Sequence, residues 1–71
     1  MKTSGPQLPD VRCERSSNLV MVEPISRRAK AWVEANVQVE PWQWLGQRFA
    51  ADAGMVSQML EGMRTEGLRV A

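Results

Sequence analysis

The spacing of apolar positions changes from one segment of the chain to the next, and these changes predict its elements. Leu19–Val22 is a short apolar run ended by Pro24, as expected of a strand inside a sheet. Ser26 then suits a helix N-cap, and we expect a helix over residues 27–35. Its buried stripe consists of Ala29, Trp32 and Val33.

Residues 42–51 fit a β-hairpin. Gly46-Gln47 matches a two-residue loop with glycine at the first central position, as a type II′ turn requires. In that register Trp44 pairs with Phe49, and side chains alternate between the two faces of each strand. The aromatic face that results carries Trp42, Trp44, Phe49 and Ala51.

A second helix follows the hairpin. Asp52 is a suitable N-cap, the helix is expected to run to about Glu66, and Gly67 suits the left-handed residue that ends it. We expect residues 68–71 to add a short last strand beside Leu19–Val22. The apolar stripe of the helix consists of Met55, Val56, Met59, Leu60 and Met63.

Residues 41–68 also fit an alternative fold, a helix-turn-helix. Pro41 suits a first helical position, and Trp42, Leu45 and Phe49 fall at helical spacing, so the region through Leu68 also resembles winged helix-turn-helix regulators. That resemblance implies a DNA-binding regulator. Its groove-facing residues would be Ser57, Gln58, Glu61 and Arg64, with Arg48 or Arg69 on phosphate. Against it, a glycine inside a helix, here Gly46, costs roughly 1 kcal/mol relative to alanine.

The element order predicts a small α+β domain over residues 19–71: strand, helix, β-hairpin, helix and short strand. We expect an antiparallel or mixed sheet with both helices on one face. Residues 1–18 are polar, aperiodic and interrupted by Pro6 and Pro9, which predicts a disordered N-terminal tail.

Charge changes this picture only slightly. The chain carries a net charge of +1, and residues 19–71 balance six basic against six acidic groups. A nucleic-acid-binding domain usually shows a basic excess, so neutrality disfavours DNA binding. The basic cluster of Arg27, Arg28 and Lys30 opposes the dipole of the first helix, and it is either a solvated face or a contact for an acidic partner or a phosphate backbone.

The chain lacks the residues of common catalytic and metal sites. It has no histidine and one cysteine, Cys13, which excludes an internal disulfide, the usual zinc spacings and a Ser-His-Asp constellation. We expect Cys13 to be an exposed free thiol. Its glycines match no phosphate-binding loop. We therefore expect no enzyme activity, no metal, no cofactor and no small-molecule substrate.

A further pattern covers residues 19–70. The segments S-R-R-A-K-A-W-V-E at 26–34, E-P-W-Q-W-L-G at 40–46 and G-M-R-T-E-G-L at 62–68 resemble those of short uncharacterised bacterial proteins. The resemblance implies a compact α+β unit and nothing catalytic.

Three tryptophans in so short a chain supply more aromatic surface than a small core readily covers. We therefore expect a protein-interaction module, either a homodimer or bound to another protein, with Trp42 and Trp44 at the contact. The sequence contains no secretory or membrane segment, and with a lone thiol this predicts a cytoplasmic protein.

Overall fold

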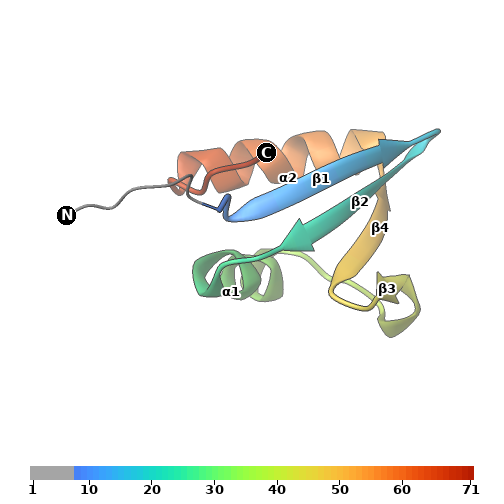
Figure 1. Ribbon diagram of the computed structural model, residues 1–71, viewed down its shortest axis with the longest axis horizontal. Coiled ribbons are helices and arrows are strands. Elements are labelled where there is room, and N and C mark those ends of the chain that lie inside the picture. The colour runs from blue at the N-terminus through green and yellow to red at the C-terminus, as the bar shows by residue number, and fades with distance from the viewer. Residues whose placement is uncertain (1–7) are drawn as a thin grey trace.

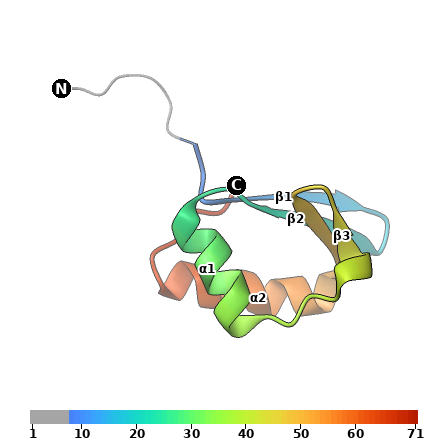
Figure 2. The ribbon, with the colours of Figure 1, turned by 90° about the horizontal axis from the view of Figure 1, so that it is seen from below.

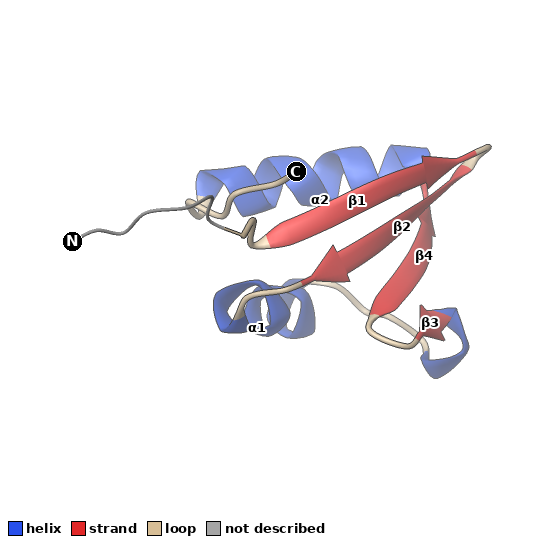
Figure 3. Cartoon of the chain, in the orientation of Figure 1, coloured by secondary structure: helices blue, strands red, loops and turns tan. Residues whose placement is uncertain are grey.

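Four strands form one antiparallel sheet in the computed structural model, which describes residues 8–71 (Figures 1 and 3). The sheet order is β1-β2-β4-β3. In chain order the elements are β1 (Val11–Ser16), β2 (Leu19–Pro24), α1 (Arg27–Asn36), the 3₁₀ turn η1 (Pro41–Gln43), β3 (Trp44–Leu45), β4 (Arg48–Asp52) and α2 (Ala53–Thr65). The predicted α+β fold is confirmed, with both helices beneath one face of the sheet (Figure 2).

The strand register places the apolar side chains on that covered face. β2 pairs with β4 so that Val22 lies opposite Phe49 and Val20 opposite Ala51. On its other side β2 pairs with β1, which puts Cys13 opposite Val22. Because paired residues point to the same face, these five side chains meet the helices together. The opposite face of the sheet has no helix over it (Figure 2).

Each helix supplies a stripe to the same core. The predicted stripe of α1 is buried at Ala29 and Val33, while Trp32 is half-buried. From α2 the core takes Val56, Met59 and Met63. Burying one such side chain stabilises a fold by about 1.5–3 kcal/mol, so these contacts fix both helices against the sheet.

Both predicted N-caps and the predicted ending at Gly67 are confirmed, whereas α1 runs one residue beyond its predicted end, to Asn36. The Ala29 N–H donates to Ser26 Oγ at 3.1 Å, and the Met55 N–H donates to Asp52 Oδ1 at 2.9 Å. Gly67 has φ +88°, and the Leu68 N–H donates to the Met63 carbonyl at 3.0 Å. This hydrogen bond and the left-handed glycine form a Schellman motif. The motif commonly includes an apolar contact between the two residues at these positions, and both Leu68 and Met63 are buried.

The predicted boundary at residue 19 is wrong, because β1 occupies Val11–Ser16 inside the expected tail. Val11 and Cys13 face the core, whereas Arg12 and Glu14 face outward. This alternation is visible in the sequence, but it covers only two apolar positions and β1 depends on pairing with β2. Residues 1–7 of the predicted tail lie outside the described residues.

The position predicted for the last strand is also wrong. Val70 forms a parallel bridge with Val11 of β1, and the Ala71 N–H donates to the Val11 carbonyl at 2.9 Å. Residues 68–71 cannot lie beside β2, because β2 already has β1 on one edge and β4 on the other. They contact the outer edge of β1 instead.

The helix-turn-helix alternative is contradicted by the hairpin. β3 and β4 pair in the predicted register, with Trp44 opposite Phe49 and Leu45 opposite Arg48. Gly46 has φ +67°, while Gln47 keeps a negative φ, as a type II′ turn requires. The glycine that is unfavourable in a helix is therefore the residue that this turn needs.

Asp10 joins three parts of the chain. Its carbonyl oxygen accepts hydrogen bonds from the N–H groups of Ile25 (2.7 Å) and Ser26 (3.2 Å), just ahead of α1. Its Oδ2 accepts the Arg69 N–H at 2.8 Å. This backbone hydrogen bond, helped by Ser26 and the nearby Arg28 charge, holds the pKa of Asp10 below its usual value.

None of the helices within residues 8–71 is long and apolar enough to cross a membrane.

The turn between β1 and β2 yields a stability prediction. Ser17 is there at φ +60°, which a residue with a Cβ adopts at a cost. We expect Ser17→Gly to raise the free energy of unfolding by about 0.5–1 kcal/mol, after the greater chain entropy of glycine is subtracted. Urea unfolding measures this. The control Ser16→Gly, within β1, should lower stability, and a destabilised Ser17→Gly variant would contradict the assigned turn.

Asp10 yields a pH prediction. Because folding lowers its pKa, the stabilisation is present above the ordinary aspartate pKa, near pH 4, and is lost as pH falls through the lower folded value. Asp10→Asn should therefore be less stable than wild type at pH 7 and should lose less stability between about pH 5 and pH 2. Thermal unfolding across this range measures the difference. Parallel acid limbs for both proteins would contradict it, with Glu61→Gln as the exposed control.

Candidate functional site

The connector between α1 and η1 forms one wall of the candidate site. It is extended, so its side chains alternate: Val37 and Val39 are half-buried against the core, and Gln38 is exposed. The Val37 N–H donates to the Val33 carbonyl at 2.8 Å, which ties the connector to the end of α1. This wall is therefore anchored at both valines.

Gln43 fixes the turn that follows. Its Oε1 accepts the Glu40 N–H at 2.8 Å, and its own N–H donates to the Glu40 carbonyl at 2.9 Å. Its Nε2 donates to the Ala50 carbonyl of β4 at 3.0 Å. In the predicted hairpin, which begins at residue 42, the next backbone pair beyond Trp44 and Phe49 would join Gln43 to Ala50. The Gln43 side chain binds Ala50 instead, and strand pairing ends at Trp44.

Trp42 does not share a face with Trp44, which corrects the predicted aromatic face. The 3₁₀ turn directs Trp42 outward, where 79% of its surface is exposed. Leu45, on the outer side of the hairpin, is 61% exposed. The two predicted contact residues therefore differ, because Trp42 is exposed and Trp44 is half-buried.

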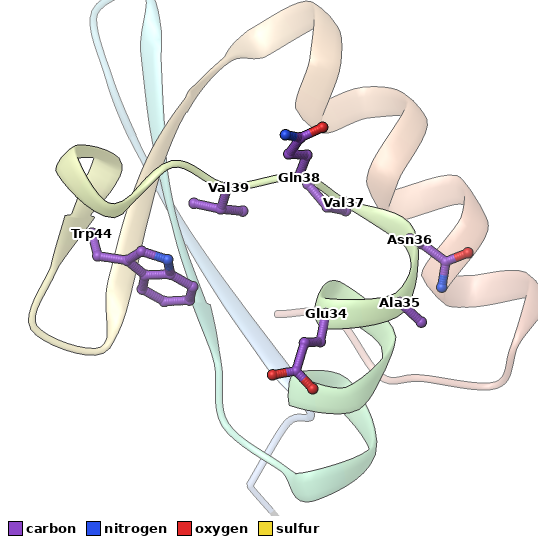
Figure 4. A pocket seen from close by; sticks show the side chains of 7 residues that line it. All are labelled: Glu34, Ala35, Asn36, Val37, Gln38, Val39 and Trp44. Carbon is purple, nitrogen blue, oxygen red and sulfur yellow. The ribbon is translucent and has the colours of Figure 1, made fainter.

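Trp44 lies on the inner side of the hairpin. Its ring meets the fully buried Phe49 edge to face, with centroids 5.1 Å apart and planes at 64°. Such an aromatic pair adds about 0.5–1.5 kcal/mol beyond the area that it buries. The rest of the half-buried indole borders a cleft between the hairpin and α1 (Figure 4).

This cleft, the aromatic cleft, has a volume of about 570 Å³. In Figure 4 the Trp44 indole and the Glu34 carboxylate both point into it, and Val39 lies above them. The side chains of Ala35, Asn36 and Gln38 point away (Figure 4). Its lining residues are Glu34, Ala35, Asn36, Val37, Gln38, Val39 and Trp44. An aromatic face and a carboxylate thus border one open space.

A second cleft of about 350 Å³ lies on the other side of the connector. It is lined by Trp32, Asn36, Val37, Gln38, Met55, Gln58 and Met59. Trp32 packs so closely on α2 that a Cβ added at Gly62 would lie 2.9 Å from its ring. This tryptophan therefore serves the contact between the helices.

The basic cluster at the start of α1 is divided by its contacts. Arg28 Nη2 donates to the Glu66 carbonyl at 2.9 Å, at the C-terminal end of α2. A cation is favourable there because the helix dipole is negative at that end. Arg27 and Lys30 are exposed and form no ion pair within residues 8–71. Arg28 thus has a structural contact that the sequence does not reveal.

Cys13 is not the exposed thiol that the sequence suggests. It is half-buried on the inner face of β1, and burial raises its pKa, although the Arg64 charge opposes this. A raised pKa keeps the group a neutral thiol near pH 7, and the thiolate is the nucleophile. Cys13 is therefore a packing residue.

Polar side chains avoid the core. Within the described part of the chain no buried side chain is polar or charged, and no cluster of three acidic, histidine or cysteine residues is placed to hold a metal. On the open face of the sheet, Arg12 lies 3.8 Å from Glu23 and Arg48 lies 3.5 Å from Glu14. These exposed pairs contribute about 0–1 kcal/mol each.

Comparison with family models, with curated proteins and with solved structures finds no match to this chain. The resemblance to short uncharacterised bacterial proteins thus stays a prediction. A function must be inferred from the geometry of the two tryptophans and the aromatic cleft.

Gln43 yields a prediction about this site. Gln43→Ala removes two side-chain hydrogen bonds that hold η1, so we expect a loss of about 1–2 kcal/mol in the free energy of unfolding. We also expect faster amide hydrogen exchange at residues 43–45. The control is Gln47→Ala, at the exposed turn of the hairpin. Equal stability and exchange in the two variants would contradict the role of Gln43.

Proposed function

We propose that this chain is a small non-catalytic protein-interaction module whose contact surface centres on Trp42. The supporting observation is an indole that is 79% exposed on a turn fixed by hydrogen bonds from Gln43. Folding alone does not require a large aromatic group at this position. Tryptophan is among the residues most enriched at the energetic centres of protein interfaces.

The surroundings of Trp42 support the same proposal. Leu45 exposes a second large apolar side chain on the adjoining short strand, and the aromatic cleft opens beside Trp44. Neighbouring exposed apolar groups mark interaction surfaces when a polar surface surrounds them. A turn with a fixed conformation also lowers the entropy lost on binding.

The partner is a protein, either a second copy of this chain or another polypeptide. A domain of this size has a marginal core, and association would remove Trp42 from water. A cytoplasmic location agrees with the free thiol of Cys13. DNA is a poorer partner, because residues 19–71 carry no net charge and the helix-turn-helix geometry is absent from the hairpin region.

Crosslinking at position 42 tests the proposal. A photoreactive benzoylphenylalanine placed there in cells that produce the protein should give a discrete covalent adduct, with a second copy or with one other protein. The same group at Gln47, in the neighbouring turn, is the control and should give none. Mass spectrometry of the adduct identifies the partner.

Sedimentation over a range of concentrations tests the homodimer. If the chain self-associates, Trp42→Ala should weaken association by about 2 kcal/mol or more, while Leu19→Ala on the distant strand end should not. Because Trp42 is exposed, its removal should change the free energy of unfolding by no more than about 0.5 kcal/mol. A chain that stays monomeric and gives no specific adduct at position 42 would contradict the proposed function.

A further inference from the structure

The geometry points to a binding site for an arginine side chain of the protein partner, in the aromatic cleft between Trp44 and Glu34. This inference deepens the proposed function and rests on it for the partner being a protein. The guanidinium would stack on the exposed part of the Trp44 ring, and the Glu34 carboxylate would accept its hydrogen bonds.

The first argument is the chemistry of the two walls. Trp44 and Glu34 come from separate elements, β3 and α1, and both side chains point into the same space (Figure 4). Tryptophan is the aromatic residue that attracts cations most strongly over its face. A carboxylate on the opposite wall adds charge attraction for the same ligand. Together these walls recognise a cation.

The second argument is that Glu34 has no cation partner of its own in residues 8–71. The ion pairs Arg12–Glu23 and Arg48–Glu14 lie on the open face of the sheet and leave Glu34 out. Lys30, one turn earlier on α1, is the cation nearest to Glu34 in sequence, but the two side chains form no ion pair. The carboxylate is therefore available to a ligand.

The third argument excludes other ligands. An anion would be repelled by Glu34, and a purely apolar group would take water from the carboxylate without replacing its hydrogen bonds. Arginine fits better than lysine, because its planar guanidinium can stack on an aromatic ring and bind a carboxylate through two parallel N–H groups.

The cleft is also formed before any ligand arrives. Phe49 holds the ring of Trp44, and Val37 and Val39 anchor the connector above the cleft. Gln43 fixes the turn that leads into β3. A ligand therefore loses little affinity to ordering of the protein.

The test uses the folded chain and a minimal probe. Acetyl-arginine methylamide is titrated into isotopically labelled protein at low salt, and NMR shifts of the backbone and of the indole N–H groups are followed. We expect saturable shifts at Trp44 and at residues 34–39, with millimolar affinity that weakens as salt is added. Acetyl-citrulline methylamide, which has the same shape and no charge, should leave these signals unchanged.

Matched variants assign the site. Glu34→Gln should weaken arginine binding about fivefold, the loss expected for one charge pair at about 4 Å in water. Glu61→Gln, an exposed carboxylate on α2, should leave it unchanged. Trp44→Phe keeps an aromatic ring against Phe49 and should also weaken binding, because phenylalanine attracts cations less strongly.

Equal shifts with arginine and citrulline, no shifts with either, or shifts confined to Glu14 and Glu23 on the open face would overturn the arginine site. Crosslinking at position 42 separates this failure from failure of the proposed function. A specific adduct at position 42 without arginine binding overturns the arginine site alone, whereas loss of the adduct overturns the proposed function.

Discussion

The pairing of β2 with β4 is the constraint on which the rest of the structure depends. These strands are far apart in the chain, and their register puts Val22 opposite Phe49 and Val20 opposite Ala51. A slip of β4 by one residue would turn Phe49 and Ala51 to the open face and remove them from the core that the helices cover. The register therefore decides where the helices, the connector and the clefts can lie.

The aromatic cleft follows from the path that this pairing imposes. β2 ends near the point where β4 begins, since the two strands are antiparallel, so the chain leaves the sheet and returns to the same end. α1, the connector and β3 make up this excursion (Figure 1). Val37 and Val39 pack this segment against the core. The aromatic cleft lies between the end of α1, the connector and Trp44 of the hairpin.

Asp10 and Arg28 make polar contacts between distant parts of the described chain. Asp10 binds the start of α1 and the backbone of Arg69, and Arg28 binds the last turn of α2. The charge of Arg28, which is unfavourable at the start of α1, is thus favourable at the C-terminal end of α2. The same is not true of Trp42, whose exposure no other part of the described chain relieves. This contrast supports the proposal that Trp42 contacts another molecule.

The sequence by itself determined the local structure of this protein. Helix caps at Ser26 and Asp52, the left-handed Gly67 and the Gly46-Gln47 turn were all predictable, because each depends on neighbouring residues and their backbone preferences. The tertiary structure decided what depends on distant partners. β1 was missed because two apolar residues form a strand only beside β2, and Trp42 parted from Trp44 because Gln43 reaches the Ala50 carbonyl. The cleft joins Glu34 to Trp44 across a connector whose path only the packed core fixes.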